Sequence, residues 1–433
     1  MTDTHADTGI AFVHGSRVWD SRGRPTLEAD VLLECGAVGR GMAPAGASTG
    51  SAEALDLRDG GIGFGGFDVT AALERVNIDI ARALAGQDAA DQEAIDAALI
   101  ALDGTPNRSH LGANAMTAVS IAVAQAAAGA VGEPLFRYLG GPEAATLPLP
   151  QIQIFGGGAH AGRRVDIQDF LVVCPQAASF AEALDWTAEV YRAAGGLMKE
   201  TGRVAGVADE GGWWPDFATN EAALETLVRA IERAGFEPGG EIAIALDVAA
   251  SDFGRGGRYR LGLENREIDS DGMIRMLARW VDAYPIVSIE DPLAEDDPAG
   301  FAAFTREMNG RIQIVGDDFL VTDAAKVRQA AAADAGNCVL LKPNQRGTLS
   351  ETLAAWRAAQ EVGFAGIVSA RSGETEDTTI VHLAVGWGVG QLKVGSFARG
   401  ERMAKWNEAL RVEEALGARG GFAGGAALAG WRG

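Results

Sequence analysis

The chain has 433 residues, which is more than one hydrophobic core usually accommodates, so we expect two domains. The 59 acidic and 37 basic residues give a formal net charge of −22, and no basic stripe offsets it, which excludes a nucleic-acid-binding protein because phosphates would be repelled. Three widely spaced cysteines, Cys35, Cys174 and Cys338, indicate buried thiols in a reducing compartment rather than a disulfide framework.

The first third of the chain predicts a compact α+β domain. Its N-terminus is polar and acidic and lacks the features of a signal peptide, so we expect a cytoplasmic protein. Residues 18–33 alternate in the manner of strands around a turn at 20–25, which predicts a hairpin. A glycine-rich loop at 46–50 follows, and residues 69–138 have helical spacing. The most apolar part, 113–132, is interrupted by polar residues and predicts a buried helix rather than a membrane span.

The rest of the chain has the rhythm of an α/β barrel. Paired prolines at 147–150 mark the boundary, so we place the α+β domain at 1–146 and the barrel domain at 147–433. Short apolar runs then alternate with helical segments such as 221–234 and 349–362. Six of these runs lead, at intervals near the length of one strand-plus-helix unit, to Asp247, Glu290, Asp317, Lys342, Ala370 and Lys393. In a parallel barrel the C-terminal ends of the strands surround one pocket, so these positions should converge on a common substrate.

Three of the six positions are carboxylates, namely Asp247, Glu290 and Asp317. Oxygen ligands of this kind suit a hard cation, and Mg²⁺ accepts a few carboxylates while it keeps coordination positions for substrate and water. Acids at strand ends also cap helices or pair with lysines, and for any one of the three that interpretation stays open. Their common position at one rim favours a magnesium site.

Two further positions are lysines. Lys342 and Lys393 both emerge from apolar runs, which implies that the stems of the side chains are buried. A lysine held near another cation and a metal can have its pKa lowered enough to act as a base, and we assign this role to Lys342. The alternative is a salt bridge across the rim.

A second set of polar groups lies outside this series. Glu210, and Gln168 with Asp169, follow other short apolar runs. A carboxyl group across the substrate from a lysine base would let protons be handled on both sides, which elimination reactions require. Taken alone, the Asp-Glu-Gly-Gly sequence around Glu210 is only a turn motif. The glycine-rich loops at 46–50 and 156–162 are candidate lids, with simple flexible connections as the alternative.

The combination of motifs resembles the enolase family from residue 18 to residue 415. The matching segments are 20–23, 46–50, 209–212, 246–251, 288–292, 316–318, 341–342, 371–377 and 411–415. The resemblance implies an N-terminal α+β capping domain, a C-terminal barrel of the enolase type, two Mg²⁺ ions and a small phosphorylated substrate. It also implies a homodimer or a higher homo-oligomer, with no nucleic acid and no membrane as partner.

Carried over position by position, the resemblance gives the metal-binding side of the pocket its roles. Asp247, Glu290 and Asp317 become ligands of the first Mg²⁺ ion. Ser48 lies on the loop that closes over a second ion. Lys342 becomes the base that removes the proton beside the substrate carboxylate. Because that proton is very weakly acidic, two divalent ions and a lysine must stabilise the enolate-like intermediate.

The resemblance also implies roles for residues on the opposite side of the pocket. Glu210 becomes the acid that serves the departing 3-hydroxyl, and Lys393 a cation beside the substrate carboxylate. The phosphate is then gripped by Arg371 and Ser372. The other substrate-binding positions that the resemblance implies are His160, Gln168, Asp169 and Ala370.

Four positions depart from the family pattern. Gly156, Ala159, Asp169 and Ala370 stand where enolases have Asn, Ser, Glu and His, and each change removes side-chain volume. Loss of one positioned acid or base typically costs roughly 100- to 10,000-fold in rate, so we expect ordinary hydratase efficiency to be reduced. The intact enolising half beside an enlarged phosphate side favours a specialised relative that resembles carboxyphosphonoenolpyruvate synthase of phosphonate biosynthesis. Such an enzyme combines 2-phosphoglycerate with a CMP-activated phosphonoformate.

Two alternatives stay open. The first is a housekeeping phosphopyruvate hydratase with unusual substitutions, which converts 2-phosphoglycerate to phosphoenolpyruvate. The second is a non-catalytic binding protein that keeps the fold, which the intact carboxylate series argues against.

Overall fold

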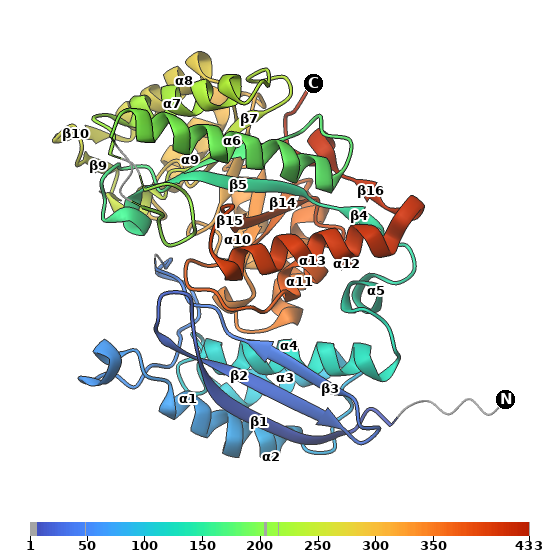
Figure 1. Cartoon of the computed structure of the whole chain (residues 1–433). Helices are drawn as coiled ribbons and strands as arrows, with labels where there is room; N and C mark the ends of the chain where they lie inside the picture. Colours follow the sequence, from blue (N-terminus) through green and yellow to red (C-terminus); the bar gives the residue numbers. More distant parts are fainter. Residues whose placement is uncertain (1–6, 48, 203–205, 215, 433) are drawn as a thin grey trace.

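The computed structural model describes residues 7–47, 49–202, 206–214 and 216–432. It is an α/β protein with an N-terminal α+β domain and a closed eight-stranded barrel, as predicted. In Figure 1 the N-terminal domain, coloured blue to cyan, lies below the barrel domain.

The N-terminal domain combines an antiparallel sheet with a set of helices. Its strands are β1 (Ile10–Trp19), β2 (Pro25–Leu33) and β3 (Val38–Met42), in the order β1-β2-β3. The helical segments are α1 (Thr70–Glu74), a π-helical stretch (Arg75–Ile80), α2 (Ala81–Leu84), α3 (Gln92–Asp103), α4 (Ala113–Ala130) and α5 (Leu135–Gly140). The predicted hairpin is confirmed, because β1 and β2 pair across a turn in which the Asp20 N–H donates to the Arg24 carbonyl at 2.9 Å.

Small residues let α4 approach the sheet closely. A Cβ atom added at Gly39 or Gly41 of β3 would overlap the backbone of α4 at Ala122 or Ala118. The alanine-rich face of α4 therefore packs directly on strand backbone. By length and composition α4 is apolar enough to cross a membrane, yet 83% of it is buried inside the protein, as expected for a core helix.

The barrel closes in the order β11-β12-β13-β14-β15-β5-β6-β7. Its strands are β5 (Leu149–Gly156), β6 (Asp169–Val173), β7 (Ala243–Asp247), β11 (Ile286–Glu290), β12 (Gln313–Gly316), β13 (Cys338–Leu341), β14 (Ala365–Ser369) and β15 (Gln391–Gly395). The surrounding helices are α6 (Phe180–Glu200), α7 (Asn220–Arg233), α8 (Ser270–Ala283), α9 (Pro298–Met308), α10 (Ala324–Ala332), α11 (Leu349–Val362), α12 (Thr379–Gly386) and α13 (Gly400–Leu416). The six positions of the predicted series all lie at or close to the C-terminal ends of strands in this barrel.

One strand runs against the others, so the prediction of a fully parallel barrel is wrong. β6 pairs antiparallel with both β5 and β7. The connection from β5 to β6 holds a 3-10 turn (Gly158–Ala161) and no α-helix. A connection of this kind joins antiparallel neighbours, whereas parallel strands need a longer crossover.

Smaller elements complete the barrel domain. A three-stranded sheet of β8 (Gly254–Arg255), β9 (Arg258–Leu261) and β10 (Arg266–Asp269) lies between β7 and α8 in the chain. Near the C-terminus, β16 (Gly421–Phe422) pairs with β4 (Thr146–Leu147). Beyond β16, the Ala427 carbonyl accepts a hydrogen bond from Gln391 Nε2 at 2.9 Å, so the last residues are tied to the barrel interior.

The two domains have separate hydrophobic cores. One cluster joins β1 and β2 to α3 and α4, and a larger one surrounds the barrel. The boundary at 146 and 147 stays a prediction. Of the three cysteines, Cys174 and Cys338 are buried as predicted, but Cys35 is exposed, because it lies in the turn between β2 and β3 rather than in a strand.

Candidate active site

The three predicted metal ligands lie at the same end of the barrel and are buried. Asp247 and Glu290 are the last residues of β7 and β11, and they are directly opposite each other in the strand register. Asp317 follows the last residue of β12. The three side chains, in this order, are 3%, 4% and 12% exposed to solvent.

Two lysine ammonium groups contact these carboxylates. Lys393 Nζ lies 2.7 Å from Asp247 Oδ2 and 2.8 Å from Glu290 Oε2, and Lys342 Nζ donates to Asp317 Oδ2. Burial acts to lower the pKa of both lysines, but the carboxylate charges outweigh burial and raise it, most strongly for Lys393. The pKa of Lys342 therefore shifts in the opposite direction to the one predicted for a base, because its nearest charge is Asp317.

The donor chemistry fits a hard divalent cation. Burial, and then the charge of Asp247, raise the pKa of Glu290 well above its ordinary value. Its Oε1 atom is buried and has no hydrogen-bond partner among the described residues. Crowded carboxylates with an unsatisfied oxygen favour a cation between them. Gln168 and Gln345 lie around this set, donating to Asp247 Oδ2 at 3.0 Å and to Asp317 Oδ1 at 2.8 Å.

A second tight group uses the neighbouring aspartates. The donor atoms of Asp291, Asp317 and Asp318 lie within 4.8 Å of one another. The backbone N–H groups of Asp317 and Asp318 donate to Asp291 at 2.9 and 2.8 Å. Burial, and then the charge of Asp317, raise the pKa of Asp318 to about 8. Asp317 thus belongs both to the three predicted metal ligands and to this cluster of aspartates.

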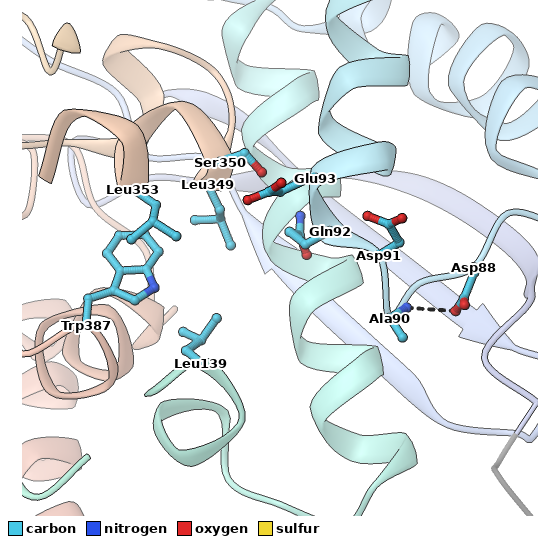
Figure 2. Close-up of a pocket in the computed structure, with 10 residues that line it drawn as sticks. All are labelled: Asp88, Ala90, Asp91, Gln92, Glu93, Leu139, Leu349, Ser350, Leu353 and Trp387. Carbon is cyan, nitrogen blue, oxygen red and sulfur yellow. Dashed lines mark hydrogen bonds between the residues drawn. The ribbon is translucent and has the colours of Figure 1, made fainter. Parts of the chain in front are cut away.

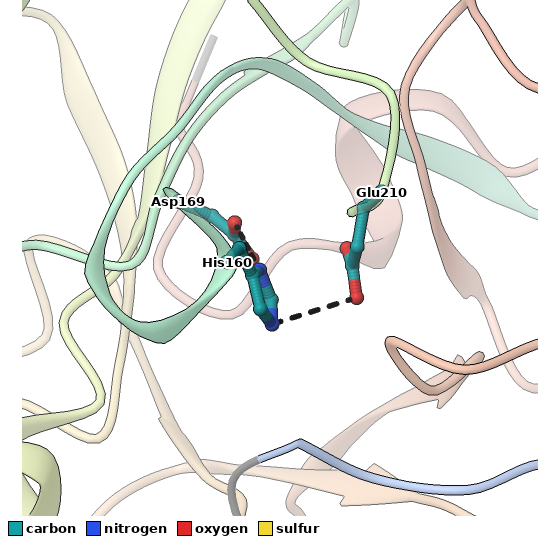
Figure 3. A group of neighbouring side chains, drawn as sticks. All are labelled: His160, Asp169 and Glu210. Atoms are coloured by element: carbon teal, nitrogen blue, oxygen red, sulfur yellow. Dashed lines mark hydrogen bonds and ion pairs between the residues drawn. The ribbon is translucent and has the colours of Figure 1, made fainter. Parts of the chain in front are cut away.

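The opposite wall of the pocket holds His160, Asp169 and Glu210 (Figure 3). His160 Nδ1 lies 3.3 Å from Asp169 Oδ1, and its Nε2 lies 4.0 Å from Glu210 Oε1. Burial alone would lower the pKa of His160, but the two carboxylates raise it to about 9. Burial raises the pKa of Glu210. The wall therefore pairs an imidazolium with a carboxyl group that takes up a proton more readily than usual.

Arg371, the predicted phosphate-binding residue, is buried and lines the pocket. Its guanidinium donates to both carboxylate oxygens of Glu53, at 2.9 and 3.2 Å, and to Asn344 Oδ1 at 3.0 Å. The buried Arg402 fixes the backbone here, because it donates to the Arg371 and Ser372 carbonyls at 2.7 and 2.6 Å.

The N-terminal domain reaches this side of the site through its first turn. Arg22 Nη1 donates to Ser372 Oγ at 3.2 Å, and Arg22 Nη2 donates to the Ala45 carbonyl at 2.9 Å. Ala45 and Gly373 exchange backbone hydrogen bonds at 2.8 and 2.9 Å. The hairpin turn and the loop after β3 thus complete a pocket whose other walls come from the barrel.

The pocket is narrow in this structure. The cavity lined by Ala370, Asp169 and the lysines measures about 30 Å³. At Gly156 an added Cβ would lie 2.6 Å from Ala208 Cβ, so a side chain at this position would require Ala208 to move. Asp169 is held by Gln153 Nε2. An enlargement of the phosphate side relative to the family pattern stays a prediction.

The structure brings together nearly all of the predicted site residues. The cavity is lined by His160, Gln168, Asp169, Glu210, Asp247, Asp317, Lys342, Ala370, Arg371, Ser372 and Lys393, with Glu290 in contact through Lys393. Ser48 lies outside the described residues. Sequence reasoning missed Glu53, Asn344, Gln345 and Arg22. The Pro-Asn-Gln sequence after Lys342 could have pointed to two of them, since polar side chains beside a metal site often orient its ligands, as Gln345 does for Asp317.

Family models match both domains of this chain, and named relatives match most of its length. The model described as Enolase, N-terminal domain, matches residues 10–139. The model described as Enolase, C-terminal TIM barrel domain, matches residues 144–429. The chain is also 49% identical, over 411 residues and 94% of each chain, to a protein named Enolase 1 from Desulfitobacterium hafniense (strain Y51).

Proposed function

The chain belongs to the enolase family of magnesium-dependent lyases, and we propose that it converts 2-phosphoglycerate to phosphoenolpyruvate. One observation carries this proposal. Three carboxylates and two lysines converge in a buried pocket, and a carboxyl group beside an imidazolium faces them. Removal of a proton beside a carboxylate, followed by loss of a hydroxyl, needs charge stabilisation on one side and an acid on the other.

Asp247, Glu290 and Asp317 are the residues that would hold a magnesium ion. When bound there, Mg²⁺ would supply positive charge that stabilises the enolate form of the substrate carboxylate and competes with the lysines for the three carboxylates. Lys342 Nζ contacts Asp317 and lines the pocket, so its ammonium group lies within the site. We assign the C2 proton to Lys342 Nζ for this reason.

Glu210 is our candidate for the acid. Burial raises its pKa, so it keeps a proton to donate at a higher pH than an exposed glutamate does. His160 lies 4.0 Å away and is itself oriented by Asp169. We assign the transfer of a proton to the departing 3-hydroxyl to Glu210, with His160 fixing its orientation.

Lys393 and Arg371 would bind the anionic ends of the substrate. Lys393 Nζ is buried among three carboxylates, with Asp169 Oδ2 at 3.7 Å in addition to Asp247 and Glu290. We assign this buried charge to the binding of the substrate carboxylate. Arg371 is planar and always charged, so its side chain suits a phosphate.

The test is direct. Purified protein is incubated with 2-phosphoglycerate and Mg²⁺, and phosphoenolpyruvate is followed by absorbance. We expect product without any nucleotide and loss of activity on chelation with EDTA. No detectable product at saturating substrate and Mg²⁺ would overturn the proposal.

A second candidate rests on Gly156, Ala159, Asp169 and Ala370, where enolases have Asn, Ser, Glu and His. A phosphonate-forming enzyme of the carboxyphosphonoenolpyruvate synthase type would need CMP-phosphonoformate as a second substrate. The relative named Enolase 1 gives this candidate no support. Assays of an Ala370→His variant and of the wild-type chain separate the two. A large gain in phosphoenolpyruvate formation in the variant marks an impaired hydratase. A new product that the wild-type chain forms only with the nucleotide, detected by mass spectrometry, marks the synthase.

The quaternary structure and the location stay predictions. We propose a homodimer, which analytical ultracentrifugation would reveal as twice the chain mass. We also propose that the protein works in the cytoplasm, which cell fractionation tests.

A further inference from the structure

A buried threonine lies next to the proposed metal site, although it is not among the described residues that line the pocket. Thr322 lies in the connection from β12 to α10 and is 0% exposed. Its backbone is left-handed, with φ at 54°, and so is the backbone of Val321, with φ at 44°. Branched residues rarely adopt this conformation, which costs about 1 to 3 kcal/mol each. Such strain persists only where the surrounding structure holds it, and it is common at functional sites.

The Thr322 hydroxyl connects two residues of the site. Its Oγ1 atom accepts from the Lys342 N–H at 3.0 Å. Two acceptors lie near its single proton, namely Gln345 Oε1 at 2.5 Å and the Leu340 carbonyl at 3.3 Å. A hydroxyl donates once, so the shorter distance assigns the proton to Gln345. The hydroxyl therefore holds both the backbone of the proposed base and the side chain of Gln345.

This hydrogen bond decides which way the Gln345 amide faces. Because Oε1 accepts from Thr322, the Nε2 group is directed to Asp317 Oδ1 at 2.8 Å and to Glu53 Oε1 at 3.2 Å. A reversed amide would set its own oxygen against two carboxylate oxygens, and these repel one another because all three are acceptors. Thr322 thus selects the orientation in which Gln345 donates to the metal ligand Asp317.

The backbone around Gln345 is held independently of Thr322. The Gln345 carbonyl accepts from the Ala54 N–H at 2.8 Å. A little further along the chain, the Leu349 and Ser350 N–H groups donate to side chains of the N-terminal domain at 3.0 and 2.9 Å. Figure 2 shows these two residues at the start of α11, across from the start of α3. The rotation of the Gln345 side chain is therefore what remains for Thr322 to set.

We propose that Thr322 is a positioning residue for the metal site, an inference that rests on the proposed function. Thr322 sets the Gln345 amide, and the amide holds Asp317 in the orientation in which it binds Mg²⁺. A carboxylate has about four acceptor positions, so the amide fixes Asp317 and leaves positions for the cation. Groups that orient metal ligands typically contribute a factor of about 10 to 100 in metal affinity. Loss of the hydroxyl should therefore be measurable in metal binding itself.

Isothermal titration calorimetry of the full chain with MgCl₂, in the absence of substrate, tests the inference. Thr322→Val removes the hydroxyl and keeps the branched shape, and we expect the Kd for Mg²⁺ to rise by roughly 10- to 100-fold. Thr322→Ser keeps the hydroxyl and should keep the wild-type Kd. Gln345→Met removes the amide and should weaken binding at least as much as Thr322→Val. The double variant should bind no more weakly than Gln345→Met alone, because Thr322 acts through Gln345.

Thr187→Val is the matched control. It removes another buried threonine hydroxyl, which donates to the Ala183 carbonyl at 2.8 Å within α6. We expect it to lower the free energy of unfolding as Thr322→Val does and to leave the Kd for Mg²⁺ unchanged. Circular dichroism and urea denaturation without Mg²⁺ verify that each variant folds. Gln345→Met leaves the left-handed backbone untouched, so it carries the test where Thr322→Val does not fold.

Several results would overturn the inference. A wild-type Kd in Thr322→Val or in Gln345→Met would do so, and so would an equal loss of affinity in Thr322→Ser or Thr187→Val. A further loss in the double variant would show that Thr322 does not act through Gln345. Absence of saturable Mg²⁺ binding to the wild-type chain also overturns the inference. Failure of the proposed reaction is a separate result, since the titrations contain no 2-phosphoglycerate.

Discussion

Glu53 of the N-terminal domain and Arg371 of the barrel form a two-point ion pair, with Nη1 2.9 Å from Oε2 and Nη2 3.2 Å from Oε1. The two side chains are 6% and 3% exposed, so the pair is buried. If Arg371 binds the substrate phosphate as proposed, the phosphate would share the guanidinium with Glu53. The pair would then link substrate binding to the contact between the domains.

Removal of Glu53 should destabilise the chain. In Glu53→Gln the buried Arg371 loses its strongest counter-charge, and breaking a buried pair typically costs about 3 to 5 kcal/mol. We expect a fall of that size in the free energy of unfolding, measured by urea denaturation. Inorganic phosphate should restore more stability to the variant than to the wild type. Glu267→Gln, which breaks an exposed pair with Arg258, is the matched control and should cost no more than about 1 kcal/mol.

Lys342 and Glu210 should affect different steps. Lys342→Met removes the proposed base and should reduce both exchange of the C2 proton of 2-phosphoglycerate into D₂O and product formation, by roughly 100- to 10,000-fold. Glu210→Gln should reduce product formation while exchange continues, because the proton is removed before the hydroxyl departs. Proton NMR measures the exchange. Loss of exchange in Glu210→Gln with normal exchange in Lys342→Met would reverse the assignment.

The charge on His160 should make stability depend on pH. The pKa of His160 is raised from 6.5 to about 9, so its interaction with Glu210 and Asp169 contributes fully below pH 6.5 and is lost as the pH rises through 9. We expect the free energy of unfolding of the wild type to fall across this window. His160→Gln should show a smaller fall, and the difference between the two urea-denaturation series isolates the histidine. An equal fall in the free energy of unfolding in both proteins would show that His160 is neutral at pH 7.

The C-terminal tail should contribute to barrel stability. Leu428 is 5% exposed and packs with Leu149, Leu171 and Val173 inside the barrel. Leu428→Ala should lower the free energy of unfolding by about 2 to 5 kcal/mol, because it leaves a cavity in packed surroundings. Leu55→Ala, at a position that is 49% exposed, is the control and should have a much smaller effect. Equal effects would mean that the tail packs loosely.

The ends of six of the eight barrel strands could be predicted from the sequence. Apolar runs that recur at the length of a strand-plus-helix unit are typical of a barrel, so Asp247, Glu290 and Lys342 were placed from spacing alone. The direction of β6 could not be predicted in this way, because a short apolar run has the same pattern whether its strand is parallel or antiparallel to its neighbours.

Contacts between distant segments were also beyond sequence reasoning. Nothing near Glu53 indicates that it faces Arg371, since the two belong to different domains. The space at Gly156 was not predictable for a related reason: a missing side chain leaves a cavity only when its neighbours stay in place, and here Ala208 Cβ lies 2.6 Å from where a Cβ would stand. The pKa of Lys342 was expected to be lowered by a nearby cation and a metal, whereas its contact in this structure is the carboxylate of Asp317.

The turn between β1 and β2 has a consequence for how such a protein can be divided. Ser21 and Arg22 contact Glu374 and Ser372 of the barrel, through the Ser21 N–H at 2.8 Å and the Arg22 guanidinium at 3.2 Å. A barrel cut from the chain would keep its carboxylates and lysines but lose the side of the pocket that this turn and the loop after β3 supply. The pocket is therefore complete only when both domains are present.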